Sequence, residues 1–97
     1  ICDEAMNLIN ECIDEYKDIG KRETNSKKFK EYWNKKKKIL SVFVNHDVID
    51  DIEISVAELS YHSTFEDNTM FFDSAIRIKT LLHQITEDTK LTAHSLL

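Results

Sequence analysis

The sequence predicts an all-α fold, an antiparallel up-down bundle of about four helices in which residues 1–97 form a single domain. The first observation is that the 97 residues include one glycine and no proline, so the turn residues typical of β-sandwiches and barrels are missing. The second is that apolar residues recur with a period near 3.6 along four successive segments. Short linkers join these segments, which favours antiparallel neighbours.

The first helix is expected over residues 2–19, because its apolar residues fall on one face. Gly20 follows directly and is expected to end the helix in the left-handed conformation. A rise of about 1.5 Å per residue places Cys2 and Cys12 roughly 15 Å apart. That separation is too large for a disulfide, so Cys12 is expected in the core. The apolar face comprises Cys2, Ala5, Met6, Ile9, Cys12, Ile13, Tyr16 and Ile19.

The second helix is expected over residues 26–45, with Asn25 or Ser26 as its N-cap. Its apolar face contains three aromatic residues, which makes Trp33 a structural anchor between helices. Lys36 lies at the edge of this face, where its stem can pack while its amine reaches water. The face comprises Phe29, Tyr32, Trp33, Lys36, Ile39, Leu40 and Phe43.

The third helix is expected over residues 47–62, with Asn45 or Asp47 as its N-cap. The sequence from Ser63 to Glu66 matches a capping box, which predicts a tight turn and a new helix from about residue 64. The apolar face of the third helix comprises Ile49, Ile52, Val56 and Leu59.

The fourth helix is expected over residues 64–87, followed by a short helical turn within residues 88–97. Its apolar band is broad, so the helix is expected to be central in the bundle. Phe71, together with Ile54 of the third helix, is a leftover apolar position that would face a partner. The band comprises Phe65, Phe72, Ala75, Ile76, Lys79, Leu82 and His83, widened by Phe71, Ile78, Leu81 and Ile85.

Basic residues are concentrated in residues 21–38, which contain nine basic and two acidic side chains. The whole chain has a net charge of −5, and the aromatic residues beside the lysines fall on the core face, so nucleic acid is not an expected partner. Two interpretations of the lysine run stay open. It is a solvated face balanced by nearby acids, or it contacts an anionic surface such as a lipid headgroup, a wall polymer or an acidic protein. The candidate residues are Lys35, Lys36, Lys37 and Lys38.

No catalytic residue, metal ligand or cofactor is expected from the sequence, and the protein is expected not to be an enzyme. No serine lies in the Gly-x-Ser-x-Gly elbow of hydrolases, and the single glycine excludes a phosphate-binding loop. No histidine follows a glutamate by three residues, as the carboxylate-bridged metal sites of helical bundles require. His46 is therefore expected to be a structural residue at the start of the third helix.

No apolar run is longer than that from Val42 to Val44, which is far below the roughly 18–20 residues needed to span a bilayer. The chain opens at Ile1 inside an amphipathic pattern, with no starting methionine and no visible signal peptide. We therefore expect the soluble part of a longer protein whose N-terminal anchor or signal is missing. Cys2 is a candidate lipidation site beside such a signal.

Four segments after residue 31 follow a recognisable order: a tryptophan with lysines, a histidine with acids, an isoleucine-rich helix and a leucine-rich helix. The tryptophan and the lysines lie in Tyr32–Lys38, and the leucines lie in Leu81–Ile85. The histidine, the acids and the isoleucines lie in Phe43–Ser55, which continues into Ala57–Leu59. This pattern resembles the domain of unknown function 4363, a family of small proteins from clostridia-like bacteria. The resemblance implies an N-terminal membrane helix followed by a helical domain outside the membrane. It implies structural roles for Trp33 and His46, with a contact between them, and no activity.

The sequence therefore predicts a non-enzymatic, extracytoplasmic interaction module that is tethered to a bacterial membrane. Its expected partner is another envelope protein or a second copy of the chain. Two alternatives stay open. One is a ligand-binding sensor domain at the cell envelope, which a polar-lined cavity between helices would favour. The other is a cytoplasmic helical regulator.

Overall fold

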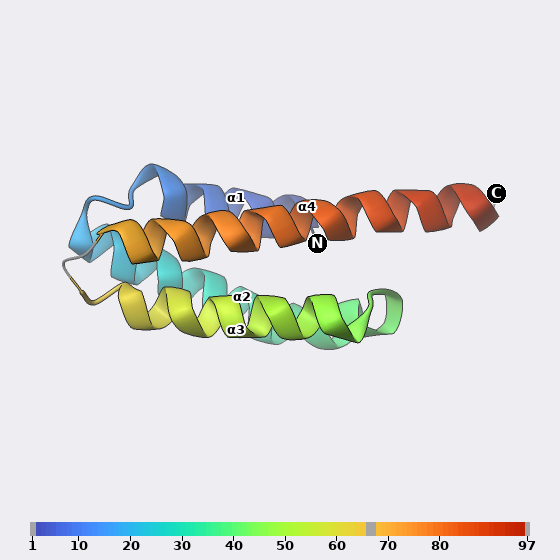
Figure 1. The fold of residues 1–97 in the computed structure, drawn as a ribbon, viewed down its shortest axis with the longest axis horizontal. Coiled ribbons are helices and arrows are strands. Elements are labelled where there is room, and N and C mark those ends of the chain that lie inside the picture. The colour runs from blue at the N-terminus through green and yellow to red at the C-terminus, as the bar shows by residue number, and fades with distance from the viewer. Residues whose placement is uncertain (1, 66–67, 97) are drawn as a thin grey trace.

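The fold is an antiparallel bundle of four helices, as the sequence predicts (Figure 1). The computed structural model describes the backbone of residues 2–65 and 68–96, and the side chains of residues 3–65 and 68–87. The lipidation predicted for Cys2 therefore concerns a side chain outside the described set. The helices are α1 (Cys2–Asp14), α2 (Ile19–Phe43), α3 (His46–His62) and α4 (Asn68–Leu96).

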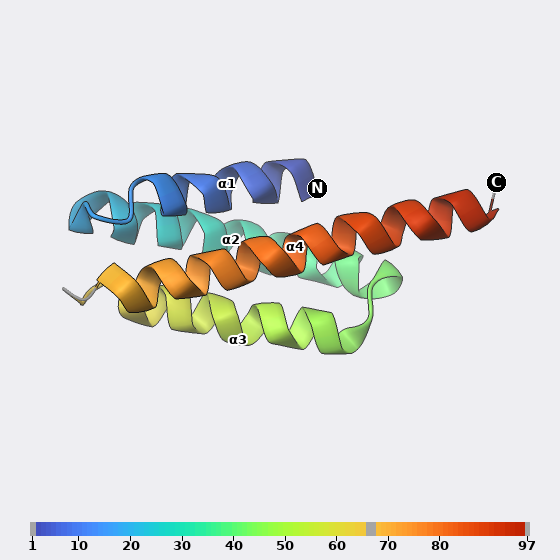
Figure 2. The ribbon, with the colours of Figure 1, turned by 45° about the horizontal axis from the view of Figure 1, so that its top comes forward.

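Each helix packs against its neighbours in the chain, and α1 also packs against α4, which closes the ring of four. The bundle is elongated, with extents of 48 × 20 × 19 Å (Figure 2). The helices differ in length, with 13 residues in α1 against 25 in α2 and 29 in α4. The described part of α1 lies beside the first half of α4 (Figure 1).

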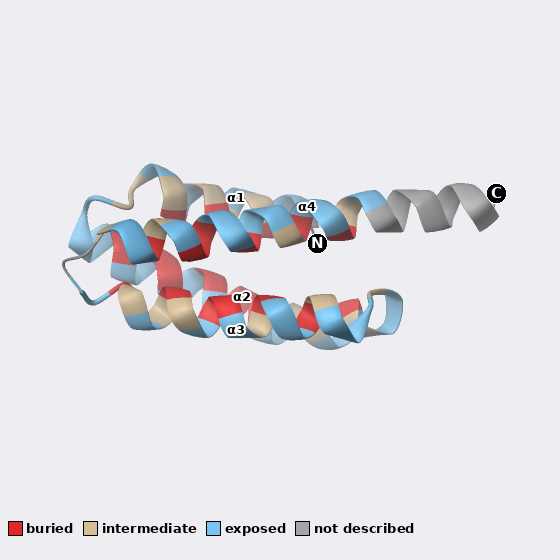
Figure 3. Cartoon of the chain, in the orientation of Figure 1, coloured by how far each residue is buried: buried red, intermediate tan, exposed pale blue. Residues whose placement is uncertain are grey.

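The core is formed by the inward sides of all four helices (Figure 3). The faces predicted for the first and third helices are confirmed at their centres, and Cys12 is fully buried as expected. Burial of these side chains is the main favourable term in folding. The buried apolar residues of α1 and α3 are Ala5, Ile9, Cys12, Ile49, Ile52, Val56 and Leu59.

The buried face of α4 is only partly the predicted one, since Ala75 and Leu82 are buried as expected and other predicted residues are not. Phe71 and Ile78 are fully buried, whereas Phe65 and Ile76 are 44% and 37% exposed. The predicted role of Phe71 as a partner-facing residue is therefore wrong, while Ile54 is exposed as expected. The cause is that apolar residues occupy more than one face of α4, so the 3.6 period alone cannot decide which face is buried.

The junction between α1 and α2 also differs, because α1 ends at Asp14 and α2 begins at Ile19. Asp18 is the N-cap of α2, and its side chain accepts a hydrogen bond of 3.1 Å from the backbone N–H of Lys21. Gly20 lies in the first turn of α2 and does not have a positive φ, so its predicted role as a helix terminator is wrong. A carboxylate that satisfies the free N–H groups of a first turn allows a new helix to begin earlier than expected. Asn25 and Ser26, the predicted caps, are buried instead.

Asn45 caps the start of α3 as expected, accepting a 2.8 Å hydrogen bond from the N–H of Asp47.

The turn between α3 and α4 lies where it was predicted, with a different cap. Ser63 is the C-cap of α3, and its hydroxyl donates to the carbonyl of Ser60 at 2.7 Å. The other half of the predicted capping box, Glu66, lies outside the described residues. The fourth helix begins at Asn68 and continues to Leu96 without the separate final turn that the sequence predicted.

A buried arginine joins the two turns at this end of the bundle. Arg22 is fully inaccessible to solvent and lies over the ring of Phe71, with its guanidinium carbon 5.5 Å from the ring centroid. Its Nε donates to the carbonyl of Ser63 at 3.2 Å, and Nη1 donates to the carbonyl of Tyr16 at 3.1 Å. Nη1 also donates to the side chain of Asn68, and Nη2 donates to the carbonyl of Phe65.

These acceptors explain how a cation is tolerated in the interior. Tyr16 follows the end of α1, and Ser63 and Phe65 follow the end of α3, so Arg22 lies at the negative ends of two helix dipoles. The planar guanidinium reaches several carbonyls at once, which the ammonium of lysine cannot do. Among the described residues, Arg22 donates to three backbone carbonyls and to the side-chain oxygen of Asn68, so the dipoles of these groups stabilise its charge.

Substituting Arg22→Lys is expected to lower the free energy of unfolding by about 2–4 kcal/mol, because each buried acceptor left without a donor costs about 1–3 kcal/mol. Urea denaturation measures this loss. Lys21→Arg, the opposite exchange at the neighbouring exposed position, is the control and should change stability by less than about 0.5 kcal/mol. Equal stability of the two variants would contradict a structural role for the guanidinium fork.

The register of α4 predicts unequal effects for two isoleucines that lie two residues apart. Ile78→Ala leaves a cavity in the core and is expected to cost about 2–5 kcal/mol, whereas Ile76→Ala is expected to cost less than about 1 kcal/mol because its side chain already contacts solvent. Thermal or urea unfolding of both variants checks the difference. A larger loss of unfolding free energy in Ile76→Ala than in Ile78→Ala would contradict the burial of Ile78.

Candidate functional site

The lysines of α2 form the largest concentration of positive charge in the chain. Of the four candidates, Lys35 and Lys38 are exposed, and Lys36 and Lys37 are half-buried. Lys37 is neutralised by Glu53 of α3, with 3.2 Å between Nζ and Oε1. Six lysines of α2 form no ion pair with an acid among the described side chains: Lys27, Lys28, Lys30, Lys35, Lys36 and Lys38.

Among the described side chains, α2 pairs with an acid that precedes it only near the turn between α1 and α2. Lys21 lies 3.1 Å from Glu15, and Asn25 donates to the same carboxylate at 3.1 Å and to the carbonyl of Glu11 at 3.3 Å. The hydrogen bond from Asn25 and then that from Lys21 lower the pKa of Glu15. The hydrogen bond to Glu15 and its negative charge raise the pKa of Lys21. Glu15, just after α1, therefore balances the first turn of α2, and the later lysines of α2 have no ion pair among the described side chains.

Trp33 anchors α2 to α3. Its side chain is 1% exposed, and its indole N–H donates to Oε1 of Glu53 at 2.6 Å. The same oxygen is the one that faces Lys37, so Glu53 connects a buried aromatic ring to a surface cation. The three side chains fix how the middle of α2 packs on α3.

His46 is the first residue of α3 and is exposed. It borders a hollow of about 240 Å³ together with Lys37, Lys38 and Asp50. The hydrogen bond of Trp33 across the two helices goes to Glu53, two turns beyond His46. Among the described side chains, no three histidine, cysteine, aspartate or glutamate residues lie close enough together to hold a metal ion.

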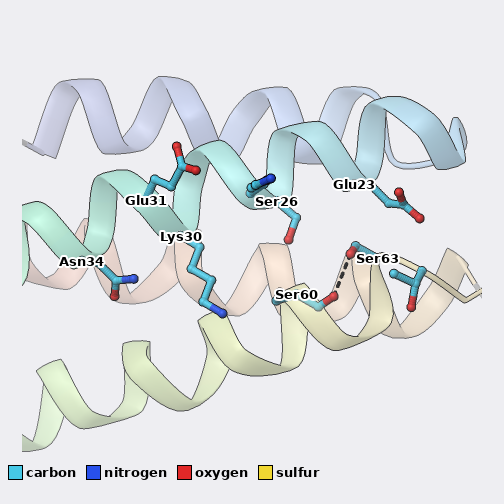
Figure 4. Close-up of a pocket in the computed structure, with 9 residues that line it drawn as sticks. Glu23, Ser26, Lys30, Glu31, Asn34, Ser60 and Ser63 are labelled. Carbon is cyan, nitrogen blue, oxygen red and sulfur yellow. Dashed lines mark hydrogen bonds between the residues drawn. The ribbon is translucent and has the colours of Figure 1, made fainter.

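A cleft lined by polar and charged residues lies between α2 and α3 near the turn that follows α3 (Figure 4). It has a volume of about 470 Å³, and Lys30 extends from α2 toward α3 across it. Two of its hydroxyl residues, Ser26 and Ser63, are buried, while the charged residues at its rim are exposed. The cleft is lined by Glu23, Ser26, Lys27, Lys30, Glu31, Asn34, Ser60, Ser63 and Thr64.

The C-terminal end of α2 carries exposed apolar residues that the sequence placed in the core. Ile39 is 48% exposed and Phe43 is 76% exposed, while Leu40 between them is buried as predicted. The neighbouring Val42 is 75% exposed. Helical periodicity identified the apolar side of α2, and it could not show which part of that side packs against other helices.

Arg22 is the residue that sequence reasoning missed. It lies seven residues before Phe29 and eleven before Trp33, so the core face of α2 extends back to it. It is also the only arginine among the nine basic residues of 21–38. An arginine on a core face within a lysine-rich segment is the signal that could have identified it.

Cys12 is the thiol that the described structure places inside the core. Burial, reinforced by the negative charge of Glu11, raises its pKa to about 12. Because the thiolate is the reactive form, this thiol is inert in the folded protein.

Comparison with known proteins gives one match. The chain matches a family described as Domain of unknown function (DUF4363) over residues 2–95. No curated protein and no solved structure matches it. None of the described helices is long and apolar enough to cross a membrane.

A Cys2→Ser variant is expected to react very slowly with a thiol reagent at pH 8, since the pKa of Cys12 near 12 leaves almost no thiolate and the side chain has no solvent contact. Stopped-flow absorbance with a chromogenic disulfide measures the rate. The same variant in denaturant is the control and should react at the rate of a free cysteine. Fast reaction of the folded variant would show that the core opens at α1.

The same pKa shift gives a direction for alkaline stability. A thiol whose pKa is 9.0 when unfolded and about 12 when folded stabilises the fold fully below pH 9. This contribution is lost as the pH rises toward 12, because the unfolded state releases the proton first. A Cys12→Ala variant should therefore show a smaller fall in unfolding free energy across this range in urea titrations at stepped pH.

Proposed function

For this chain, which belongs to the DUF4363 family of domains of unknown function, we propose the role of a non-enzymatic interaction module of the bacterial cell envelope. In this proposal the bundle is tethered to the membrane and lies on its extracytoplasmic side. It binds an acidic surface of another envelope protein through the outer side of α2.

The unpaired lysines of α2 carry the proposal. Six of them form no ion pair with the described acids, although the chain as a whole has a net charge of −5. A fold that needed these lysines only for internal balance would pair them with its own carboxylates. Unpaired charges of one sign along a single helix attract a complementary surface and speed its association.

The rigidity of α2 supports the same role. Trp33 and Arg22 fix the helix from within, through Glu53 on one side and the two turns on the other. An interaction surface on a helix that is held in one position loses little conformational entropy when a partner binds. The lysines themselves stay free to adapt, since their long stems are solvated.

A second candidate, a ligand-binding sensor domain, is favoured by the cleft between α2 and α3. Its volume of about 470 Å³ suits a small polar molecule, and its lining offers hydroxyl, amide, ammonium and carboxylate groups. A screen of small polar compounds by thermal shift distinguishes the two candidates. A stabilising compound whose effect is lost in Ser60→Val would favour the sensor, whereas the interaction module predicts no such compound.

A photo-reactive residue at Asn34, on the exposed side of α2, is expected to give a discrete crosslinked adduct in cells that produce the natural protein. Triple substitution of Lys27, Lys30 and Lys38 by glutamine should remove most of this adduct, because the attraction depends on those charges. Immunoblotting measures the adduct.

The same photo-reactive residue at Asp73, which is exposed on α4, is the matched control and should give no adduct of that size. An Asn34 adduct that survives the triple substitution would overturn the basic side of α2 as the docking surface. The proposed location has its own test, in which a cysteine at exposed Thr24 reacts with a membrane-impermeant maleimide in intact cells. Reaction only after lysis would exclude the extracytoplasmic side.

A further inference from the structure

The cleft between α2 and α3 contains a buried serine whose hydroxyl has no hydrogen-bond partner among the described residues. Ser26 is 2% exposed and lines the cleft. The buried Ser74 of α4, by contrast, donates to the carbonyl of Met70 at 3.0 Å. In Figure 4 the oxygen of Ser26 points toward α3 and into the cleft. A buried donor without an acceptor costs free energy, so this hydroxyl is placed for an acceptor that enters from outside.

The same cleft contains ammonium groups that no described acid neutralises. Lys27 and Lys30 line it and form no ion pair among the described side chains. Lys30 extends across the cleft toward α3, whereas Glu31 points away from α3 (Figure 4). An ammonium has three N–H donors and no acceptor. Ser26 and Lys30 therefore both offer protons to one occupant, which must be an acceptor with negative charge.

The remaining lining residues limit the charge of the occupant. Ser63 and Thr64 use their protons inside the chain, since each donates to a backbone carbonyl of α3. Glu23 and Glu31 are exposed at the rim and offset part of the positive charge. A carboxylate carries one negative charge, whereas a phosphate group carries close to two at neutral pH. Two lysines beside two acids therefore suit a carboxylate better than a phosphate.

The groove between α2 and α3 continues beyond the cleft. Lys27, Lys30 and Asn34 line the cleft, and Lys38 and Ser41 line the hollow of about 240 Å³ beside the start of α3. Their spacing of three or four residues places all five on one side of α2. Helix rise separates Lys27 from Lys38 by roughly 16 Å. An extended chain covers that distance in about five residues, so two acids five positions apart in a partner can reach both lysines.

We propose that the groove between α2 and α3 binds an extended acidic segment of the partner protein, and that the cleft receives one of its aspartate or glutamate side chains. Ser26 and Lys30 donate hydrogen bonds to this carboxylate, and Lys27 lies beside it. A second carboxylate, about five residues along the segment, meets Lys38. The inference rests on the proposed function, because it names the part of the acidic partner that α2 recognises.

The groove favours a segment of a chain over a free small acid. Lys27, Lys30 and Lys38 are exposed, and single ion pairs at exposed positions are weak. Two carboxylates on one chain act together, because binding of the first holds the second near its lysine at a high effective concentration. A free acid makes only the first contact and gains no such advantage.

An NMR titration of the isotope-labelled 97-residue chain tests the inference, because chemical shifts detect weak binding. The probe is a capped hexapeptide with the sequence Glu-Ser-Ser-Ser-Ser-Glu, whose acids lie five positions apart. It should shift the amide resonances of Ser26, Lys30 and Lys38, with an effect that weakens as salt rises. The same peptide with glutamine in place of both acids should cause no such shifts. The rearranged peptide Glu-Glu-Ser-Ser-Ser-Ser should bind at least about threefold more weakly, because it reaches one end of the groove only.

Two buried serines form a matched pair for the hydroxyl. Ser26→Ala should raise the Kd of the hexapeptide at least about threefold, because it removes the buried donor. Ser74→Ala makes the same change on α4 and should retain binding within about twofold. Thermal unfolding separates binding from packing: Ser26→Ala should be at least as stable as the wild type, because the lost hydroxyl had no partner in the fold.

Four lysines of α2 form a matched pair for the charge. Lys27→Gln/Lys30→Gln should weaken peptide binding at least about tenfold, since it removes both cations from the cleft. Lys28→Gln/Lys35→Gln removes two exposed lysines that lie roughly 100° around α2 from the groove, and it should retain binding within about twofold. Circular dichroism shows whether every variant is folded.

Four outcomes would overturn the inference: no shifts with the hexapeptide, equal shifts with its glutamine version, full binding by Ser26→Ala, or an equal loss in the lysine control. Inorganic phosphate that shifts the same amides at a lower concentration than the hexapeptide would overturn it too, by assigning the cleft to a phosphate ligand. Failure of the crosslinking or maleimide tests with peptide binding intact would overturn the proposed function alone. Absence of peptide binding with those tests positive would overturn this inference alone.

Discussion

Arg22 is the interaction on which the arrangement of the four helices depends. It lies in the first turn of α2 and donates to the residues that follow α1 and α3 and to the start of α4. One side chain therefore joins all four helices at the end where both turns lie. Burying a charge is costly unless its hydrogen bonds are satisfied, and here the carbonyls at the ends of two helices satisfy it. The same end contains the contact of Tyr16 with Phe72, whose ring centroids are 4.8 Å apart.

The opposite end of the bundle contains the turn between α2 and α3. Leu40 is 7% exposed and belongs to the core, whereas Phe43, one turn later, is 76% exposed. Asn45 caps α3 just beyond Phe43, and its side chain accepts a hydrogen bond from the N–H of Asp47. A buried arginine therefore organises one end of the bundle, and a short capped turn with exposed apolar residues before it forms the other.

The sequence was sufficient for the fold class and for the faces of α1 and α3, because each of those helices has one narrow apolar stripe. It was insufficient where apolar residues lie on several sides, as with Phe71 and Ile76 of α4. The sequence also misplaced the start of α2. Gly20 was expected to end the first helix, whereas Asp18 caps α2 and Gly20 lies in its first turn. Of the four candidate lysines, periodicity could not show which one pairs across helices, because that depends on where Glu53 of α3 lies.

A chain with a net charge of −5 should be repelled by an anionic surface if its charge acted as a whole. At physiological ionic strength, however, electrostatic interactions between exposed groups fade over about 8 Å, and the bundle is about 20 Å across. The six lysines of α2 that form no ion pair among the described side chains therefore act on a surface that touches them, while acids farther away on the bundle are screened by salt. The local distribution of charge along α2, rather than the net charge of the chain, decides whether an acidic partner is attracted.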